Sequence, residues 1–92
     1  MTHKLSIAWS KRALSDLDKI AKFIEADQPA AAHMLVQAIR AKTKLLEITP
    51  HLGREILPGL RELIVHRHYL VVYRIRNDNV QVLQVWHTAR KR

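Results

Sequence analysis

The chain has no cysteine, only two glycines and three prolines, and few aromatic residues. Without cysteine it can form no disulfide and offers no thiolate as nucleophile or metal ligand, which is typical of proteins in a reducing compartment. It also has no apolar N-terminal run that resembles a signal peptide, and no stretch long enough to span a membrane. We therefore expect a single domain over residues 1–92 that is cytoplasmic and has no membrane partner.

Acidic residues are scarce as well, because eight Asp and Glu stand against sixteen Lys and Arg, which gives a formal net charge of +8. Residues 1–50 hold six of the seven lysines, whereas residues 51–92 hold seven of the nine arginines. Lysine is a hydrated point charge that suits exposed helix faces, and the planar guanidinium of arginine binds phosphate or carboxylate bidentately. We therefore expect the functional surface in the second half, and a partner rich in phosphate or carboxylate.

Hydrophobic periodicity in the first half predicts one strand and two helices. A strand is expected from Leu5 to Trp9, and a helix over about residues 11–26 with Ser10 as its N-cap. A second helix is expected to start at Pro29, with Asp27 or Gln28 as its cap, and to stop before Pro50. Two helices joined by so few residues must form an antiparallel hairpin.

Beyond Pro50 the period of the apolar residues changes from that of a helix to that of strands. Residues 50–59 contain two prolines and both glycines, and are predicted to be a loop. Strands are expected over residues 60–65, 69–76 and 80–87, with a tight turn at residues 77–79. The fold class is therefore α+β: an N-terminal strand, the antiparallel helix hairpin and a three-stranded antiparallel meander, with the helices packed on one face of the sheet.

Several short segments, taken in this order, resemble the RelE/ParE superfamily of bacterial toxins. They are Trp9-Ser10 before the first helix, Pro50-x-x-Gly53-Arg54, Leu60-Arg61-Glu62-Leu63, the strand from Tyr69 to Ile75, and the ending Val85-Trp86-His87-Thr88-Ala89-Arg90. The resemblance covers nearly the whole chain, and it rests on order and spacing more than on any one motif. It implies the RelE/ParE-like fold and a growth-inhibiting toxin of a type II toxin–antitoxin system, of the plasmid stabilisation type. Such a toxin would be held inactive in a hetero-oligomer with a cognate, acidic antitoxin.

The superfamily has two activities, and the resemblance allows both. ParE-like members act on DNA gyrase, and RelE-like members are endoribonucleases that cleave mRNA on the ribosome. Metal-independent RNA cleavage needs a base, an acid and cations beside the phosphate. In that case Arg61, His87 and Arg90 would be the catalytic residues, with no metal or other cofactor.

One departure from the ribonuclease pattern favours the gyrase interpretation. The ribonucleases that this chain resembles carry an arginine at the position of Leu70, so one of their phosphate-binding residues is missing here. For either activity we expect the target or antitoxin to contact a shared set of residues: Arg54, Arg61, Tyr73, Arg74, His87 and Arg90. Tyr73 also fits the core of its strand, and His87 fits a structural role at a strand end.

A different class of function, a basic nucleic-acid-binding module without toxicity, is the main alternative. A groove-reading helix would need to be rich in Arg, Asn or Gln, whereas both expected helices mix lysines with acidic residues. His66 and His68 alternate on one face, but no third residue has the spacing of a zinc ligand. The sequence therefore favours the toxin, with no metal site.

Overall fold

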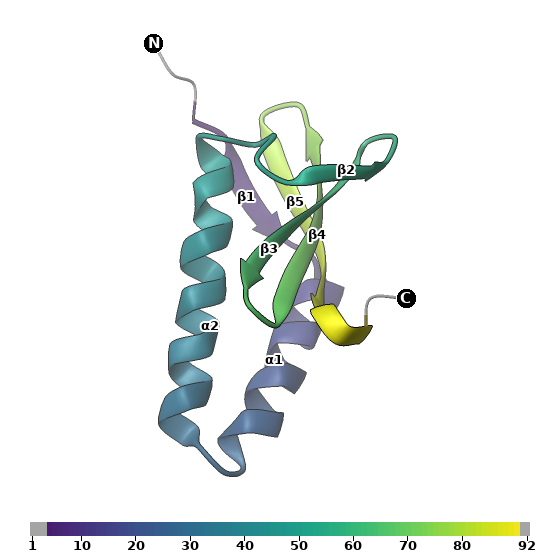
Figure 1. Cartoon of the computed structure of the whole chain (residues 1–92). Coiled ribbons are helices and arrows are strands. Elements are labelled where there is room, and N and C mark those ends of the chain that lie inside the picture. The colour runs from purple at the N-terminus through teal and green to yellow at the C-terminus, as the bar shows by residue number, and fades with distance from the viewer. Residues whose placement is uncertain (1–3, 91–92) are drawn as a thin grey trace.

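Two helices pack on one face of a five-stranded mixed sheet (Figure 1), which confirms the predicted α+β class. The computed structural model describes the backbone of residues 4–90 and the side chains of residues 4–89. The elements, in chain order, are β1 (Ser6–Trp9), α1 (Lys11–Glu25), α2 (Pro29–Lys44), the 3-10 turn η1 (Leu45–Glu47), β2 (Arg54–Leu57), β3 (Leu60–His66), β4 (Tyr69–Arg76), β5 (Asn79–His87) and the 3-10 turn η2 (Thr88–Arg90).

The helix hairpin begins as the sequence predicts. The Ser10 side chain accepts a hydrogen bond of 3.0 Å from the Ala13 N–H, so it caps a backbone donor that has no partner within α1. Pro29 occupies the first turn of α2, where its missing N–H costs nothing. The α-helix stops at Lys44, earlier than expected, and η1 continues the chain for one further turn. No helix in the described part of the chain is both long and apolar enough to cross a membrane.

The prediction of a loop over residues 50–59 is wrong for its second half, because Arg54–Leu57 forms β2. β2 is an edge strand that pairs antiparallel with β3, where Arg54 lies opposite Glu62 and Glu55 opposite Arg61. A turn at Pro58 and Gly59 joins the two strands, and Gly59 has a φ of +78°. The proline and both glycines therefore flank the strand, and its hydrogen bonds to β3 outweigh their local preference for a loop.

The sheet has the order β1-β5-β4-β3-β2, so the N-terminal strand lies beside the last strand. β1 pairs parallel with β5, and all the other neighbours are antiparallel. The register shifts between Glu55 and Leu57 on β2 and between Ile64 and His66 on β3. It also shifts between β4 and β5, where Val72 pairs with Gln84 and Tyr73 with Val82, so that Leu83 is an extra residue of β5. These irregularities decide which side chains face the helices.

The helix-facing side of the sheet carries the hydrophobic core. Ile39 of α2, Ala13 of α1 and the strand residues Val71, Tyr73 and Val82 are all fully buried in one cluster. Directly paired residues point to the same face of a sheet, and residues next in sequence point to opposite faces. The opposite face, here called the open face, therefore carries Arg54, Glu62, Val72, Arg74, Gln84 and Trp86.

The loop between η1 and β2 is fixed by hydrogen bonds that we call the loop anchor, made by Tyr73 and Arg61. The Tyr73 hydroxyl donates to the Pro50 carbonyl at 2.7 Å and accepts from the Gly53 N–H at 2.9 Å. Nη1 of Arg61 donates to the Gly53 carbonyl at 2.7 Å. Burial raises the pKa of Tyr73, an effect that the Gly53 hydrogen bond and the Arg61 charge oppose, so the hydroxyl keeps its proton. The anchor therefore satisfies polar groups inside the fold.

Residue 53 must be a glycine, because the loop anchor leaves no room for a Cβ at this position. A Cβ at residue 53 would lie 2.5 Å from the Glu62 carbonyl oxygen and 2.7 Å from the Tyr73 ring. We expect Gly53→Ala to lower the free energy of unfolding by about 3 kcal/mol, through overpacking and the lost hydrogen bond. At Gly59 a Cβ meets nothing within 4 Å, so Gly59→Ala should cost only about 1 kcal/mol for its positive φ. Urea unfolding of both variants measures this difference, and equal losses would contradict the anchor.

Candidate functional site

The expected contact residues do not form one cluster, because they lie on both faces and at both ends of the sheet. Arg54 and Arg74 are on the open face. Nε and Nη2 of Arg54 each lie 2.9 Å from the Oε1 oxygen of Glu62. The Glu62 carboxylate is buried, whereas 70% of the Arg54 side chain is exposed. The ion pair therefore fixes the direction of this guanidinium and offsets part of its charge.

Arg74 of β4 is oriented by Gln81, its directly paired neighbour on β5. Its Nε donates to Oε1 of Gln81 at 2.6 Å, and the two residues are directly paired between β4 and β5. A neutral amide orients the guanidinium without cancelling its charge. Arg74 is therefore an oriented cation of the open face that can meet a carboxylate or a phosphate.

A small apolar hollow of about 180 Å³ lies on the same face, between the β2–β3 hairpin and β5. Leu57, Leu60, Val72 and Trp86 line it together with Ile56, Glu62 and Gln84. Leu57 is largely exposed, and the Trp86 indole donates to the Gln84 side chain. Tryptophan and arginine are enriched among the hot-spot residues of protein–protein interfaces, which contribute most of the binding free energy. The open face thus has the composition of a protein-binding surface.

Tyr73 and Arg61 belong to the fold more than to this surface. Tyr73 has no exposed area, which overturns its expected contact with the target or antitoxin. Its hydroxyl is occupied by Pro50 and Gly53, so it acts as a structural group. Arg61 is half-buried and directs Nη1 at the Gly53 carbonyl, so its guanidinium supports the loop. The position of Tyr73 in an apolar strand already indicated its core role, but no sequence pattern indicated the hydrogen bonds of its hydroxyl to Pro50 and Gly53.

His87 lies at the other end of the sheet, among aromatic rings. Its ring stacks on that of His68 with the centroids 5.7 Å apart, and it meets Tyr69 edge to face at 5.2 Å. Nδ1 of His87 accepts a hydrogen bond of 3.1 Å from the Ala89 N–H, which orients the ring. A cleft of about 440 Å³ opens beside it, lined by Phe23, Ile24 and other residues. The contacts of His68 and Tyr69 with His87 were missed from sequence, because only the register of β4 and β5 brings them together.

Arg61 and His87 are too far apart to act on one phosphate. Arg61 is paired with Tyr73, and His87 is paired with Tyr69, on the two sides of β4. Four residues of strand and two strand spacings separate their Cα atoms by about 16 Å. The guanidinium of Arg61 is also held at the Gly53 loop, so it does not extend toward His87. The arrangement does not place these two groups on a common reacting atom.

Two further positions, Leu70 and Arg90, matter for a ribonuclease, and neither provides a cation among the described side chains. Leu70, which stands where the ribonucleases carry an arginine, has only 1% of its surface exposed and pairs with Trp86. Arg90 ends η2, and its side chain lies outside the described residues.

Comparison with known proteins places the chain in a family. Residues 7–92 match the family described as the ParE toxin of the type II toxin–antitoxin system parDE. The chain is 31% identical over 84 residues to Toxin RelE2 of Caulobacter vibrioides, covering 91% of this chain and 96% of that protein. It is 39% identical over 83 residues to Putative toxin Y4kP of Sinorhizobium fredii, covering 88% of this chain and 85% of that protein.

A solved structure agrees with this assignment. The chromosomal ParDE toxin–antitoxin system from P. aeruginosa contains a chain with a TM-score of 0.82 and 27% identity, and the match covers 94% of this chain and 98% of that one. The family match spans the helix hairpin and β2 to β5, and thus every element that builds the open face and the loop anchor. The chain belongs to the ParE toxin family, within the RelE/ParE superfamily of toxins of type II toxin–antitoxin systems.

Proposed function

We propose that this toxin inhibits growth by binding DNA gyrase, and that a cognate acidic antitoxin neutralises it in a hetero-oligomer. The observation that carries the gyrase proposal is the separation of Arg61 from His87. Metal-independent RNA cleavage needs an acid or base and a cation within hydrogen-bond reach of the same phosphate. Groups about 16 Å apart on a rigid sheet do not meet that need. Binding to a protein target needs no such convergence.

The open face is the surface that we assign to the target. It combines an oriented cation at Arg74, the Arg54–Glu62 ion pair, and an apolar hollow beside Trp86. Apolar centres with charged rims are typical of protein-binding surfaces. His87 and Arg90 remain proposed contacts at the other end of the sheet.

Ribosome-dependent mRNA cleavage is the second candidate. It is favoured by the 31% identity to a protein named Toxin RelE2 and by the presence of His87 at the end of β5. A nucleic-acid-binding module without toxicity is not proposed, because the chain belongs to a toxin family over residues 7–92.

One experiment separates the two candidates. Purified toxin and its His87→Ala variant are assayed in parallel for inhibition of gyrase supercoiling and for cleavage of mRNA on programmed ribosomes. We expect supercoiling inhibition and no mRNA fragments. His87→Ala should weaken inhibition by no more than about tenfold, because shortening one side chain at an interface seldom costs more than about 1.4 kcal/mol.

Ribonuclease chemistry would give the opposite result. Cleavage at the ribosome, reduced by roughly 10²- to 10⁴-fold in His87→Ala, is the loss expected when a general acid or base is removed. That outcome would reject gyrase as the target while leaving the family assignment in place.

The open face can be tested against the helix hairpin by removing one positive charge from each. Arg74→Ala should relieve growth inhibition, because it removes the oriented cation of the open face. Lys22→Ala on α1 is the matched control, since Lys22 forms an exposed pair with Asp18 that contributes little to stability. Growth after induction is measured for both variants, with thermal unfolding to show that each is folded. If Lys22→Ala relieved inhibition and Arg74→Ala did not, the helix hairpin would be the target surface.

A further inference from the structure

The apolar hollow of the open face, about 180 Å³ in volume, is too small for a free ligand. Pockets that hold small molecules or cofactors measure about 300–1,000 Å³. The lining is mostly apolar and comes from four strands, with Leu57 of β2, Leu60 of β3, Val72 of β4 and Trp86 of β5. The hollow therefore suits one aliphatic side chain that a partner protein inserts from outside.

Arg74 lies beside the hollow with part of its guanidinium unused. Arg61 of β3 pairs antiparallel with Tyr73 of β4. The next positions on these strands, Leu60 and Arg74, therefore lie side by side on the open face. Nε of Arg74 donates to Gln81, and its Nη1 and Nη2 make no hydrogen bond to a described residue. The N–H donors on these two nitrogens are left for a carboxylate, which can bind them in bidentate geometry.

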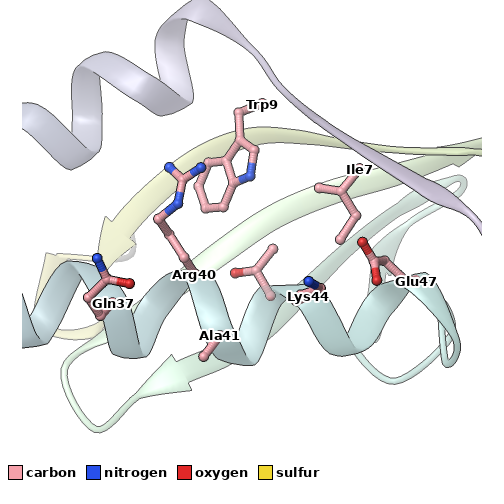
Figure 2. A pocket seen from close by; sticks show the side chains of 8 residues that line it. Ile7, Trp9, Gln37, Arg40, Ala41, Lys44 and Glu47 are labelled. Atoms are coloured by element: carbon pink, nitrogen blue, oxygen red, sulfur yellow. The ribbon is translucent and has the colours of Figure 1, made fainter.

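Two other arginines with a fixed direction already have partners. Arg54 directs two nitrogens at the Glu62 carboxylate. In the cleft between β1 and α2 (Figure 2), the Arg40 guanidinium lies 5.3 Å from the centre of the Trp9 ring, and Glu47 adds a carboxylate to the same lining. Of these three arginines, the one beside the hollow is therefore the best placed to bind an acidic group.

The centre of the open face offers side chains but no backbone groups. β4 has a strand on each side, so its N–H and C=O groups are used within the sheet. A segment that lies over β4 must therefore satisfy its own backbone groups, as a helix does. Val72 and Arg74 are two residues apart, about 7 Å along the strand. Residues one turn apart on a helix have a similar spacing, about 5–6 Å between their Cβ atoms.

We propose that the open face binds a helix of the target whose aliphatic side chain enters the hollow and whose carboxylate, one turn away, meets Arg74. The inference rests on the proposed function, because it describes the part of gyrase that this surface recognises. Helices bind in grooves through apolar residues at such spacings, and a charged contact sets their register. A second copy of the toxin is a poor occupant, since each chain has a net charge of +8.

Opposite charges at Leu57 test the charge of the partner. Leu57 lines the hollow and is 62% exposed, so its replacement spares the core. Leu57→Glu and Leu57→Lys remove the same apolar wall, but only the glutamate repels a carboxylate. We expect Leu57→Glu to raise the toxin concentration for half-maximal inhibition of supercoiling at least about tenfold more than Leu57→Lys. Met34→Ala, which shortens an exposed apolar side chain on α2, should leave this concentration unchanged. Thermal unfolding shows that each variant is folded.

A peptide experiment tests the same surface without gyrase. Two helical peptides are titrated into isotope-labelled toxin, one with glutamate and leucine four residues apart and one with lysine in place of the glutamate. We expect only the glutamate–leucine peptide to shift the NMR signals of the Trp86 indole N–H and the Arg74 Nε–H, with a Kd of about 1 mM. In Arg74→Gln the difference between the two peptides should disappear.

The results that would overturn the inference differ from those that would overturn the gyrase proposal. Equal effects of Leu57→Glu and Leu57→Lys, or equal shifts with the two peptides, would reject an acidic helix as the occupant. Shifts of the same signals by a single-stranded oligonucleotide but not by the glutamate–leucine peptide would assign the face to nucleic acid, and would also reject it. If the toxin left supercoiling unchanged but bound this peptide at Trp86 and Arg74, gyrase would be rejected as the target and the preference of the open face would stand.

Discussion

The hydrogen bonds that Tyr73 and Arg61 make to residues 50–53 are the constraint on which the second half of the structure depends. They join the loop after η1 to the centre of β4, and they fix where β2 starts. Without them, the backbone groups of Pro50 and Gly53 would lack these partners, and an unmade buried hydrogen bond costs about 1–3 kcal/mol. β2 in turn carries Arg54 to the buried Glu62 carboxylate. A core hydroxyl thus positions a surface cation.

Local periodicity was sufficient to predict both helices, the Ser10 cap and the strands β3 to β5, because each has a regular apolar pattern. It failed at Arg54–Leu57, where proline and glycine on both sides resemble a loop and the strand exists only by pairing with β3. The side of the sheet on which each arginine lies could not be predicted either. That depends on the register, including the shifts after Ile64 and at Val72. Composition showed that most arginines lie in the second half of the chain, but only the strand pairing and hydrogen bonds showed that Arg61 supports a loop and that Arg74 lies on the open face.

The role of the loop anchor can be measured directly as the hydrogen-exchange rate of the Gly53 amide, compared in the wild-type toxin and in Tyr73→Phe. The Tyr73 hydroxyl accepts from this amide inside the fold, so we predict slow exchange that becomes fast when the hydroxyl is removed. Tyr69→Phe, which leaves the loop untouched, should not change the rate. If the Gly53 amide exchanged equally fast in the wild-type toxin and in Tyr73→Phe, the loop would not be anchored and this account of the fold would be wrong.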